Sequence, residues 1–186
     1  PKTIVAELCA RVGREHGDLR GRTILVSAGG TREAIDPVRF VGNHSSGKMG
    51  NALAEVARDR GADVVLVTTV PDSAPAAVEV RAVSSAQSMS DAIHERVAGA
   101  DALVMAAAVA DYRPEAPAEL KIKRADAGDM SIDLVENDDI IASVQGDLVK
   151  VAFAAETNDL IANAEKKLAA KGAQLIVAND VTATDA

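Results

Sequence analysis

The chain has 186 residues, of which 48% are hydrophobic and 26% are charged, a balance typical of one folded globular domain. Its formal net charge of −8 argues against broad binding to nucleic acids or acidic membranes, because both partners need a basic surface. The single cysteine, Cys9, excludes an internal disulfide and a metal site built from several cysteines, and it fits a reducing cytoplasm.

Short apolar runs alternate with segments of helical periodicity, and none of the runs approaches the roughly 20 residues that would span a bilayer. The N-terminal segment predicts a helix followed by a polar link. Strands are then predicted over 23–28, 62–69, the start of 101–110, 148–157 and 173–180. Helices are predicted over 48–61, 85–99, 137–146 and 158–172.

Strands that alternate with helices indicate an α/β protein with a Rossmann-like three-layer fold and a mainly parallel sheet. In such folds ligands bind beyond the carboxyl ends of the strands, which directs attention to the loops after Ala28, Met105, Ala152 and Val177. The link over 112–130 is long, polar and rich in Pro and charge, so it predicts a functional flap loop. Residues 131–137 alternate in polarity and predict either an antiparallel strand or an extended arm.

The stretch GNHSSGKMG, residues 42–50, is close to a Walker A phosphate loop. Gly42, Gly47 and Lys48 fit that pattern, but Met49 stands where a Ser or Thr hydroxyl would bind magnesium. The stretch also begins more than ten residues after its strand, whereas a P-loop follows its strand directly. The sequence therefore predicts a different kind of phosphate site.

The same region offers several groups that bind anions. Ser45–Gly47 lie where a helix is predicted to begin, and free backbone N–H groups there attract negative charge. Arg39 can form a fork onto a phosphate or carboxylate, and the amide of Asn43 can hold a carbonyl or phosphoryl oxygen. Two simpler interpretations stay open: a serine that only caps the helix, and a surface ion pair between Arg39 and Asp36.

The later loops also carry candidate groups, each with a simpler alternative. Asp111 can bind a ribose hydroxyl, help to bind a metal, or cap a turn before Pro114. The cations of KIKR, Lys121–Arg124, can close over a triphosphate or form a solvated charge cluster. Phe153 can face a base or pack in the core. Lys167 and Lys171 share one helix face, near a C-terminal end where cations are favourable in any case.

Together these segments resemble one enzyme family. SAGGTREAIDPVRFVGNHSSGKMG, AAAVADYRP, KIKR, FAAET and ANDV are similar to segments of the phosphopantothenoylcysteine synthetases, and the resemblance runs from about Gly21 to Ala186. It implies a ligase of coenzyme A biosynthesis that activates the carboxylate of 4'-phosphopantothenate with CTP. An acyl-cytidylate forms and pyrophosphate leaves. The amine of L-cysteine then attacks, which gives the amide product and CMP.

The resemblance also implies a homodimer and, in many bacteria, a flavin-dependent decarboxylase fused ahead of the synthetase. On that basis residues 1–20 are expected to be a linker helix from a preceding domain, and residues 21–186 the synthetase domain with a shortened C-terminus. The flap has Arg124 where the family commonly has lysine, a change that affects geometry more than charge.

Roles for individual residues follow from the resemblance. Asn43 matches the asparagine that holds the acyl-nucleotide intermediate. Arg39 matches an arginine that is important for the second half-reaction, and Lys121 matches a flap lysine that acts on the triphosphate. The residues matched to nucleotide or phosphate binding are Ser45, Ser46, Gly47, Ala107, Ala108, Asp111, Lys121, Phe153, Lys167 and Lys171. No dedicated metal ligand is implied, so Mg²⁺ is expected to bind mainly through the triphosphate.

Other functions fit the same architecture. One is the same ligase driven by ATP, and another is a module that binds a nucleotide without turnover. A third is a nicotinamide-dependent oxidoreductase, which needs a glycine-rich fingerprint and an acidic residue after the second strand. The fingerprint is absent, and TTVPDS provides only Asp72 as the acid.

Overall fold

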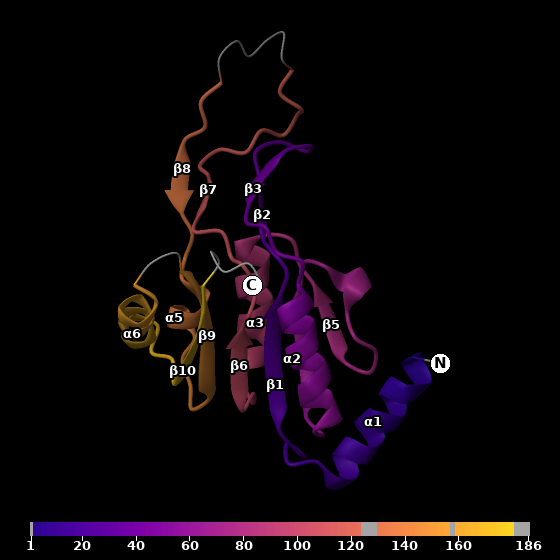
Figure 1. Ribbon diagram of the computed structural model, residues 1–186. Coiled ribbons are helices and arrows are strands. Elements are labelled where there is room, and N and C mark those ends of the chain that lie inside the picture. The colour runs from indigo at the N-terminus through magenta and orange to yellow at the C-terminus, as the bar shows by residue number, and fades with distance from the viewer. Residues whose placement is uncertain (1, 124–129, 157–158, 181–186) are drawn as a thin grey trace.

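A central parallel sheet organises the protein, as seen in a computed structural model that describes residues 2–123, 130–156 and 159–180 (Figure 1). Within these residues six strands form the sheet, in the order β10-β9-β6-β1-β4-β5. All of its neighbouring strands are parallel. The prediction of a Rossmann-like α/β fold is therefore confirmed.

The elements follow one another along the chain as the alternating pattern predicts. The helices are α1 (Lys2–His16), α2 (Lys48–Asp59), α3 (Ala86–Val97), α5 (Ile140–Ser143) and α6 (Leu160–Ala170), with a 3-10 turn η1 (Pro71–Ser73). The strands of the main sheet are β1 (Thr23–Ala28), β4 (Asp63–Thr68), β5 (Glu79–Ala82), β6 (Ala102–Met105), β9 (Val149–Glu156) and β10 (Leu175–Asp180). Two short antiparallel pairs join β2 (Arg32–Ala34) to β3 (Phe40–Gly42), and β7 (Tyr112–Pro114) to β8 (Leu134–Glu136).

The strand order places a change of direction between β1 and β6. From β1 the chain proceeds outward through β4 to β5, then crosses back to β6 and continues through β9 to β10. Farther along, the chain after β1 leads to α2 on one face of the sheet and the chain after β6 leads to α5 on the other, and such a change of direction opens a crevice at the carboxyl ends of the strands. This crevice is where ligands bind in folds with this topology.

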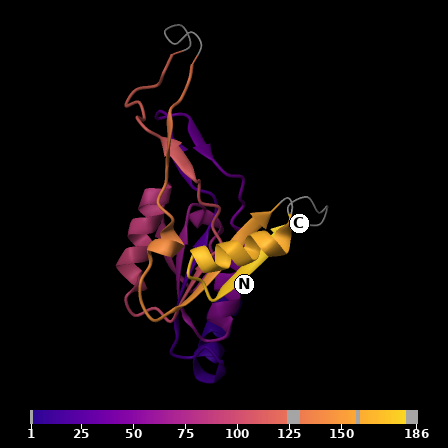
Figure 2. The same cartoon turned by 90° about the vertical axis from the view of Figure 1, so that its left-hand side faces the viewer.

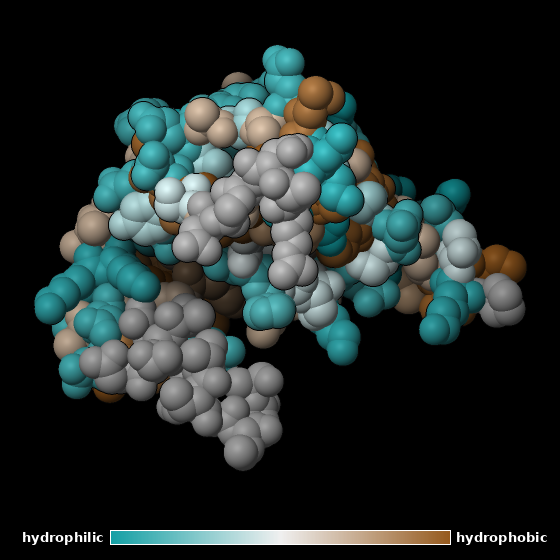
Figure 3. Space-filling model, turned by 90° about the horizontal axis from the view of Figure 1, so that it is seen from above, coloured by the Kyte–Doolittle hydropathy of each residue, from teal (hydrophilic) through white to brown (hydrophobic). Residues whose placement is uncertain are grey.

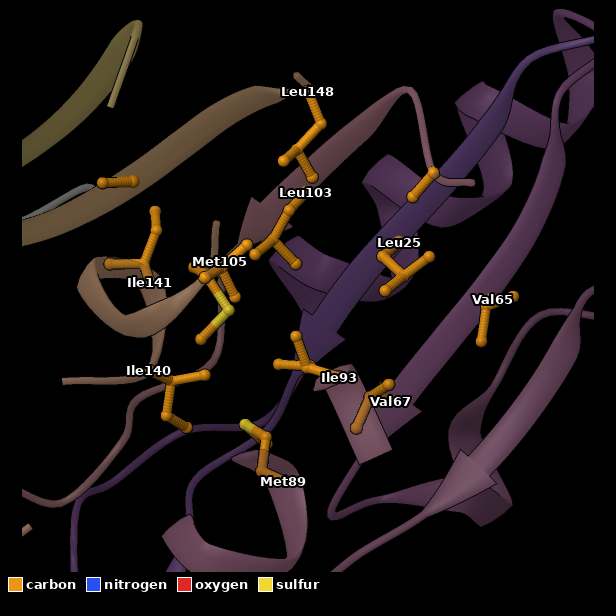
Figure 4. Close-up of a cluster of buried hydrophobic side chains, with 13 residues drawn as sticks. Leu25, Val65, Val67, Met89, Ile93, Leu103, Met105, Ile140, Ile141 and Leu148 are labelled. Atoms are coloured by element: carbon orange, nitrogen blue, oxygen red, sulfur yellow. The ribbon is translucent and has the colours of Figure 1, made fainter. Parts of the chain in front are cut away.

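Helices cover both faces of the sheet, as the side view shows (Figure 2). On one face, α3 and α5 contribute Met89, Ile93 and Ile140 to a buried cluster with β1, β4 and β6 (Figure 4). On the other, α2 packs Ala54 and Ala57 against β1 and β4, and α1 lies outside it against α2. With aromatics at only 2% of the sequence, the core is built from aliphatic side chains and alanine.

Small residues allow α2 to approach β1 closely. A Cβ added to Gly50 would lie 2.6 Å from both the Ser27 carbonyl oxygen and the Ala28 Cβ. Side chains larger than hydrogen do not fit there without a backbone shift. Because α2 begins immediately after the candidate phosphate-binding turn, this contact also fixes that turn relative to β1.

Two extended arms rise from the carboxyl end of the sheet and lie side by side (Figures 1 and 2). One is the β2–β3 hairpin and the other is the β7–β8 pair, and β2 contacts β7. The sequence did not predict β2, β3 or β7. It predicted one long link over 112–130, but the first three residues of that link form β7 and pair with β8. The alternation over 131–137 is confirmed as an antiparallel strand.

Other boundaries also needed correction. The edge strand β5 was missed because its four residues are all exposed, so they present no apolar run. The strands predicted over 148–157 and 173–180 are confirmed, but the loops expected directly after Ala152 and Val177 are not, because β9 and β10 continue past both residues and Phe153 lies within β9. Arg124 of the expected flap, Thr157, Asn158 and residues 181–186 lie outside the described residues.

Replacement of Gly50 by alanine tests the close contact between α2 and β1. Alanine is the better helix former, yet Gly50→Ala should lower the free energy of unfolding by about 1–3 kcal/mol because the added methyl overpacks the interface. The measurement is denaturant unfolding. Ala52→Leu, on the exposed face of the same helix, should change it by less than about 0.5 kcal/mol. Equal stability of Gly50→Ala and the wild type would contradict this packing account.

Candidate functional site

A cleft of about 660 Å³ lies at the carboxyl ends of β6 and β9. Its lining residues come from five separate parts of the chain: Asn43, Met105–Tyr112, Glu136–Ile141, Ala152–Ala154, and Lys167 with Lys171. Seen from above, this end of the molecule shows mostly hydrophilic residues with hydrophobic ones among them (Figure 3). Its volume suits a nucleotide-sized ligand, and so does its position at the carboxyl end of the sheet, next to the switch in strand direction between β1 and β6.

The segment after β6 forms the floor of the cleft, and the loop after β1 holds it in place. The Ala107 N–H donates to the Ser27 hydroxyl (3.0 Å), and the Ala110 N–H donates to the Thr31 hydroxyl (2.9 Å). Both hydroxyl side chains are fully buried. Between them, Ala108 exchanges backbone hydrogen bonds with Gly29 and Thr31. The predicted nucleotide-binding residues Ala107 and Ala108 are therefore part of a rigid, small-residue platform.

Asn43 reaches this platform from the first arm. Its Nδ2 donates to the Val109 carbonyl at 3.2 Å, and its side chain lines the cleft. The two ends of the first arm also lie close together, because Gly30 has no side chain: an added Cβ there would lie 2.5 Å from the Asn43 carbonyl oxygen. The structure thus brings together Asn43 and the residues after β6, as the sequence predicted from two distant segments.

Cations and an aromatic ring complete the far side of the cleft. Phe153, Lys167 and Lys171 all line it. The Lys171 ammonium donates to the Asp139 carboxylate at 2.8 Å, and the second oxygen of that carboxylate accepts the Ala142 N–H at the start of α5. The two lysines predicted from the sequence therefore face the same space as Asp111, which is exposed at its rim.

Residues 136–141 are a part of the site that the sequence did not reveal. Asn137 is bound on three sides: its Nδ2 donates to the Ala110 carbonyl and its N–H to the Asp111 carbonyl, both at 2.8 Å, and its Oδ1 accepts from Arg113 at 2.9 Å. The run NDDII predicted only a capped helix. Three consecutive polar residues before the buried Ile140 and Ile141 were the only sequence signal of a binding segment. Their position beside the segment after β6 follows from the topology of the fold and could not be predicted from the sequence.

The serine turn lies outside the residues that line the cleft. Ser45 and Ser46 are exposed, and the N-cap of α2 is Gly47, which has a φ of 73° and no side-chain cap. An added Cβ at Gly47 would lie 2.5 Å from the Val70 side chain. The interpretation of a serine as an ordinary helix cap is therefore wrong. The first N–H groups of α2 keep their capacity to bind an anion.

Arg39 and Asp36 do form a pair, but its carboxylate is buried rather than on the surface. The Arg39 guanidinium donates to Asp36 Oδ2 at 2.5 and 3.1 Å and to the Ile122 carbonyl at 3.0 Å. The hydrogen bonds that the Arg39 side chain donates to Asp36 hold the pKa of this carboxyl well below its usual range. Hydrogen bonds from backbone N–H groups add to this effect, and burial opposes it. Lys121, next to Ile122, is exposed and does not line the cleft.

Comparison with known proteins identifies the family. Residues 19–186 match the model of the DNA/pantothenate metabolism flavoprotein C-terminal domain. The chain belongs to this family. It is 51% identical over 179 residues to the coenzyme A biosynthesis bifunctional protein CoaBC of Mycobacterium tuberculosis, and 53% identical over 170 residues to that of Vibrio parahaemolyticus. Each match covers 88% of this chain and 43% of the relative, so the chain spans less than half the length of these proteins.

Solved structures of the family share the fold. The C-terminal domain of a CoaBC protein has a TM-score of 0.73 at 42% identity, covering 86% of this chain and 78% of that one. The flavoprotein from Streptococcus pneumoniae has a TM-score of 0.76 at 28% identity, covering 87% and 83%. A Cab2 mutant in complex with phosphopantothenate-cysteine is 17% identical with a TM-score of 0.70, a similarity of fold alone. Among the described residues, we find no helix with the length and apolar character to cross a membrane.

The bond between Thr31 and Ala110 offers a test of how the floor of the cleft is held. Thr31→Val keeps the shape but removes the acceptor, which leaves the Ala110 N–H buried without its side-chain partner. The free energy of unfolding should fall by about 1–3 kcal/mol, measured by denaturant titration. The same substitution at the exposed Thr3 should change it by less than about 0.5 kcal/mol. A loss at Thr31 no larger than at Thr3 would contradict the proposed support.

Proposed function

We propose that this chain is a phosphopantothenate–cysteine ligase of coenzyme A biosynthesis that uses CTP. A carboxylate oxygen of 4'-phosphopantothenate attacks the α-phosphorus of CTP, the bond to pyrophosphate breaks, and an acyl-cytidylate forms. The amine of L-cysteine then attacks the acyl carbon, CMP leaves, and the amine loses a proton to solvent. The observation that carries this proposal is the bond from Asn43 to Val109, which brings an amide of the first arm to the rim of a nucleotide-sized cleft.

The groups in the cleft suit this chemistry. Attack on a phosphoryl group depends more on positioning and charge neutralisation than on an acid or base. The small residues of the floor would admit the flat nucleotide, Phe153 would lie beside its base, and Asp111 would bind a ribose hydroxyl. Lys167 and Lys171 would contact its phosphates. Asn43 would hold the acyl-phosphate oxygens as the charge develops on them.

The remaining assigned residues are not among those that line the cleft. The uncapped start of α2, with Ser45–Gly47, would bind a phosphate through backbone N–H groups and hydroxyls. Lys121 would reach the triphosphate from the flap, and Arg39 would contribute to the second half-reaction. Mg²⁺ would be held mainly by triphosphate oxygens, as is usual for this ion in nucleotide sites. Its chemistry would be to neutralise phosphate charge.

The arms suit contact between two copies of the chain. Val38 and Phe40 on one arm, and Tyr112 and Leu134 on the other, are about half exposed despite their size. Large exposed apolar side chains concentrated on two neighbouring arms are typical of an interface. We therefore propose a homodimer formed through the arms. The relatives are named as bifunctional and are more than twice as long as the matched part, which supports a fusion to a second domain; we propose that this is the flavin-dependent decarboxylase. A cytoplasmic location agrees with the single cysteine.

The direct test is pyrophosphate release in a mixture of the protein, 4'-phosphopantothenate, L-cysteine, Mg²⁺ and either CTP or ATP. The expected result is release that depends on phosphopantothenate and is faster with CTP. Faster release with ATP would keep the ligase and reassign its nucleotide. Nucleotide binding with no release from either one would instead favour a binding module and overturn the proposal.

Asn43→Asp tests the residue assigned to the acyl-nucleotide. A carboxylate has nearly the same shape but repels phosphoryl oxygens and cannot donate to Val109, so product formation should fall by roughly 10²-fold, and by much more than nucleotide affinity. Turnover and nucleotide titration measure the two effects. Gln145→Glu adds the same charge at the opposite end of the sheet and should leave both unchanged. Wild-type turnover by Asn43→Asp would refute the role.

A further inference from the structure

Among the described carboxylates of the arms, Asp36 accepts the most hydrogen bonds, and it does not line the cleft. It is 3% exposed. Its Oδ1 accepts the Val38 and Arg39 backbone N–H groups, each at 2.8 Å. Its Oδ2 accepts the Arg39 side chain and, at 3.1 Å, the Ile122 backbone N–H. The two oxygens therefore have different tasks: Oδ1 shapes its own turn, and Oδ2 binds a segment 86 residues away.

The segment bound by Oδ2 is the described root of the flap. Ile122 is held through both of its backbone groups, because its N–H donates to Asp36 and its carbonyl accepts from Arg39. Four residues earlier, the Ala118 N–H donates to the Ile35 carbonyl at 2.8 Å. Lys121 lies between these two attachments and directly before Ile122. Its exposed side chain therefore projects from a backbone that the first arm fixes in place.

We propose that Asp36 is a positioning residue for Lys121. The carboxylate fixes the Ile122 peptide and orients Arg39 onto the Ile122 carbonyl, and so sets the point from which the lysine extends toward the triphosphate. This inference rests on the proposed function, since that function gives Lys121 its ligand. Asp36 itself does not touch the nucleotide.

The bond to Ile122 exceeds what the turn requires. A turn that begins with Asp is complete when one oxygen accepts the N–H groups two and three residues later, as Oδ1 does here. Burial of the charge against a second segment costs free energy unless hydrogen bonds replace the lost water, and Arg39 and Ile122 supply them. The same bonds keep the carboxylate ionised: with its pKa lowered, the stabilisation is complete above the usual Asp value of about 3.9 and is lost only as the pH falls below it.

Asp36→Asn separates the two tasks. The amide oxygen can still accept the two turn N–H groups, but the amide nitrogen that replaces Oδ2 cannot accept from Arg39 or Ile122. Pyrophosphate release with CTP should slow by about tenfold or more, because a displaced lysine no longer meets the phosphates. Glu119→Gln is the matched control, since it removes one carboxylate from the same loop at an exposed position, and it should keep the wild-type rate.

A double-mutant cycle tests whether Asp36 acts through Lys121. The rate to compare is pyrophosphate release in a single turnover without L-cysteine, in which the second half-reaction assigned to Arg39 does not take place. If Asp36 acts through Lys121, Asp36→Asn should change this rate by less than about twofold once Lys121→Gln is present, whereas independent effects would multiply. Multiplied effects, or a wild-type rate in the Asp36→Asn single variant, would overturn the positioning role. A merely structural contribution would persist in the Lys121→Gln background, so the cycle distinguishes the two.

Hydrogen exchange tests the anchoring without any nucleotide. The Ile122 amide should exchange at least about tenfold faster in Asp36→Asn than in the wild type and in Glu119→Gln, because its acceptor is gone. Unchanged protection would overturn the proposal whatever the activity shows. Faster exchange in a protein whose wild type releases no pyrophosphate would keep the anchor and refute only the proposed function.

Discussion

The joining of the loops after β1 and β6 is the constraint on which the rest of the site depends. Gly30 and Ala108 form a parallel bridge beyond the ends of the two strands, and the Ser27 and Thr31 hydroxyls hold the neighbouring amides. These bonds hold the two loops together next to the sheet, and the two chain segments separate only farther from it. Asn43 can meet the Val109 carbonyl only because the two loops already lie together. Loss of this pairing would separate the first arm from the cleft.

The electrostatics of the site differ from those of the whole chain. In an acidic protein of net charge −8, Lys167 and Lys171 lie on one side of the cleft, and Lys171 forms an ion pair with Asp139. An ion pair at a partly exposed position contributes little free energy, so a ligand can displace it at little cost. Its cation remains close to where the phosphates would lie. The proposed reaction needs this arrangement, since it requires neutralised charge at a fixed place more than a proton donor.

Much of this could be predicted from the sequence, and the exceptions have physical reasons. Buried strands such as β1 and β4 are continuous apolar runs, so their number and alternation with helices were evident. β5 and the strands of the first arm are short and mostly exposed. They are strands because they pair with neighbouring segments, and their sequences show no apolar pattern that would predict this. Asn43 and Phe153 could be assigned because they lie in recognisable segments. Asn137 could not, because its importance comes from contacts with Ala110 and Arg113 across the fold.

The central claim is that the cleft activates a carboxylate as an acyl-nucleotide, and oxygen labelling tests it most directly. The measurement starts from 4'-phosphopantothenate with ¹⁸O in both carboxylate oxygens and follows the label by mass spectrometry after turnover with CTP and L-cysteine. Attack by the carboxylate on the α-phosphorus predicts one ¹⁸O in each CMP and one in each amide product. Unlabelled CMP, with the label in pyrophosphate or phosphate, would contradict the account.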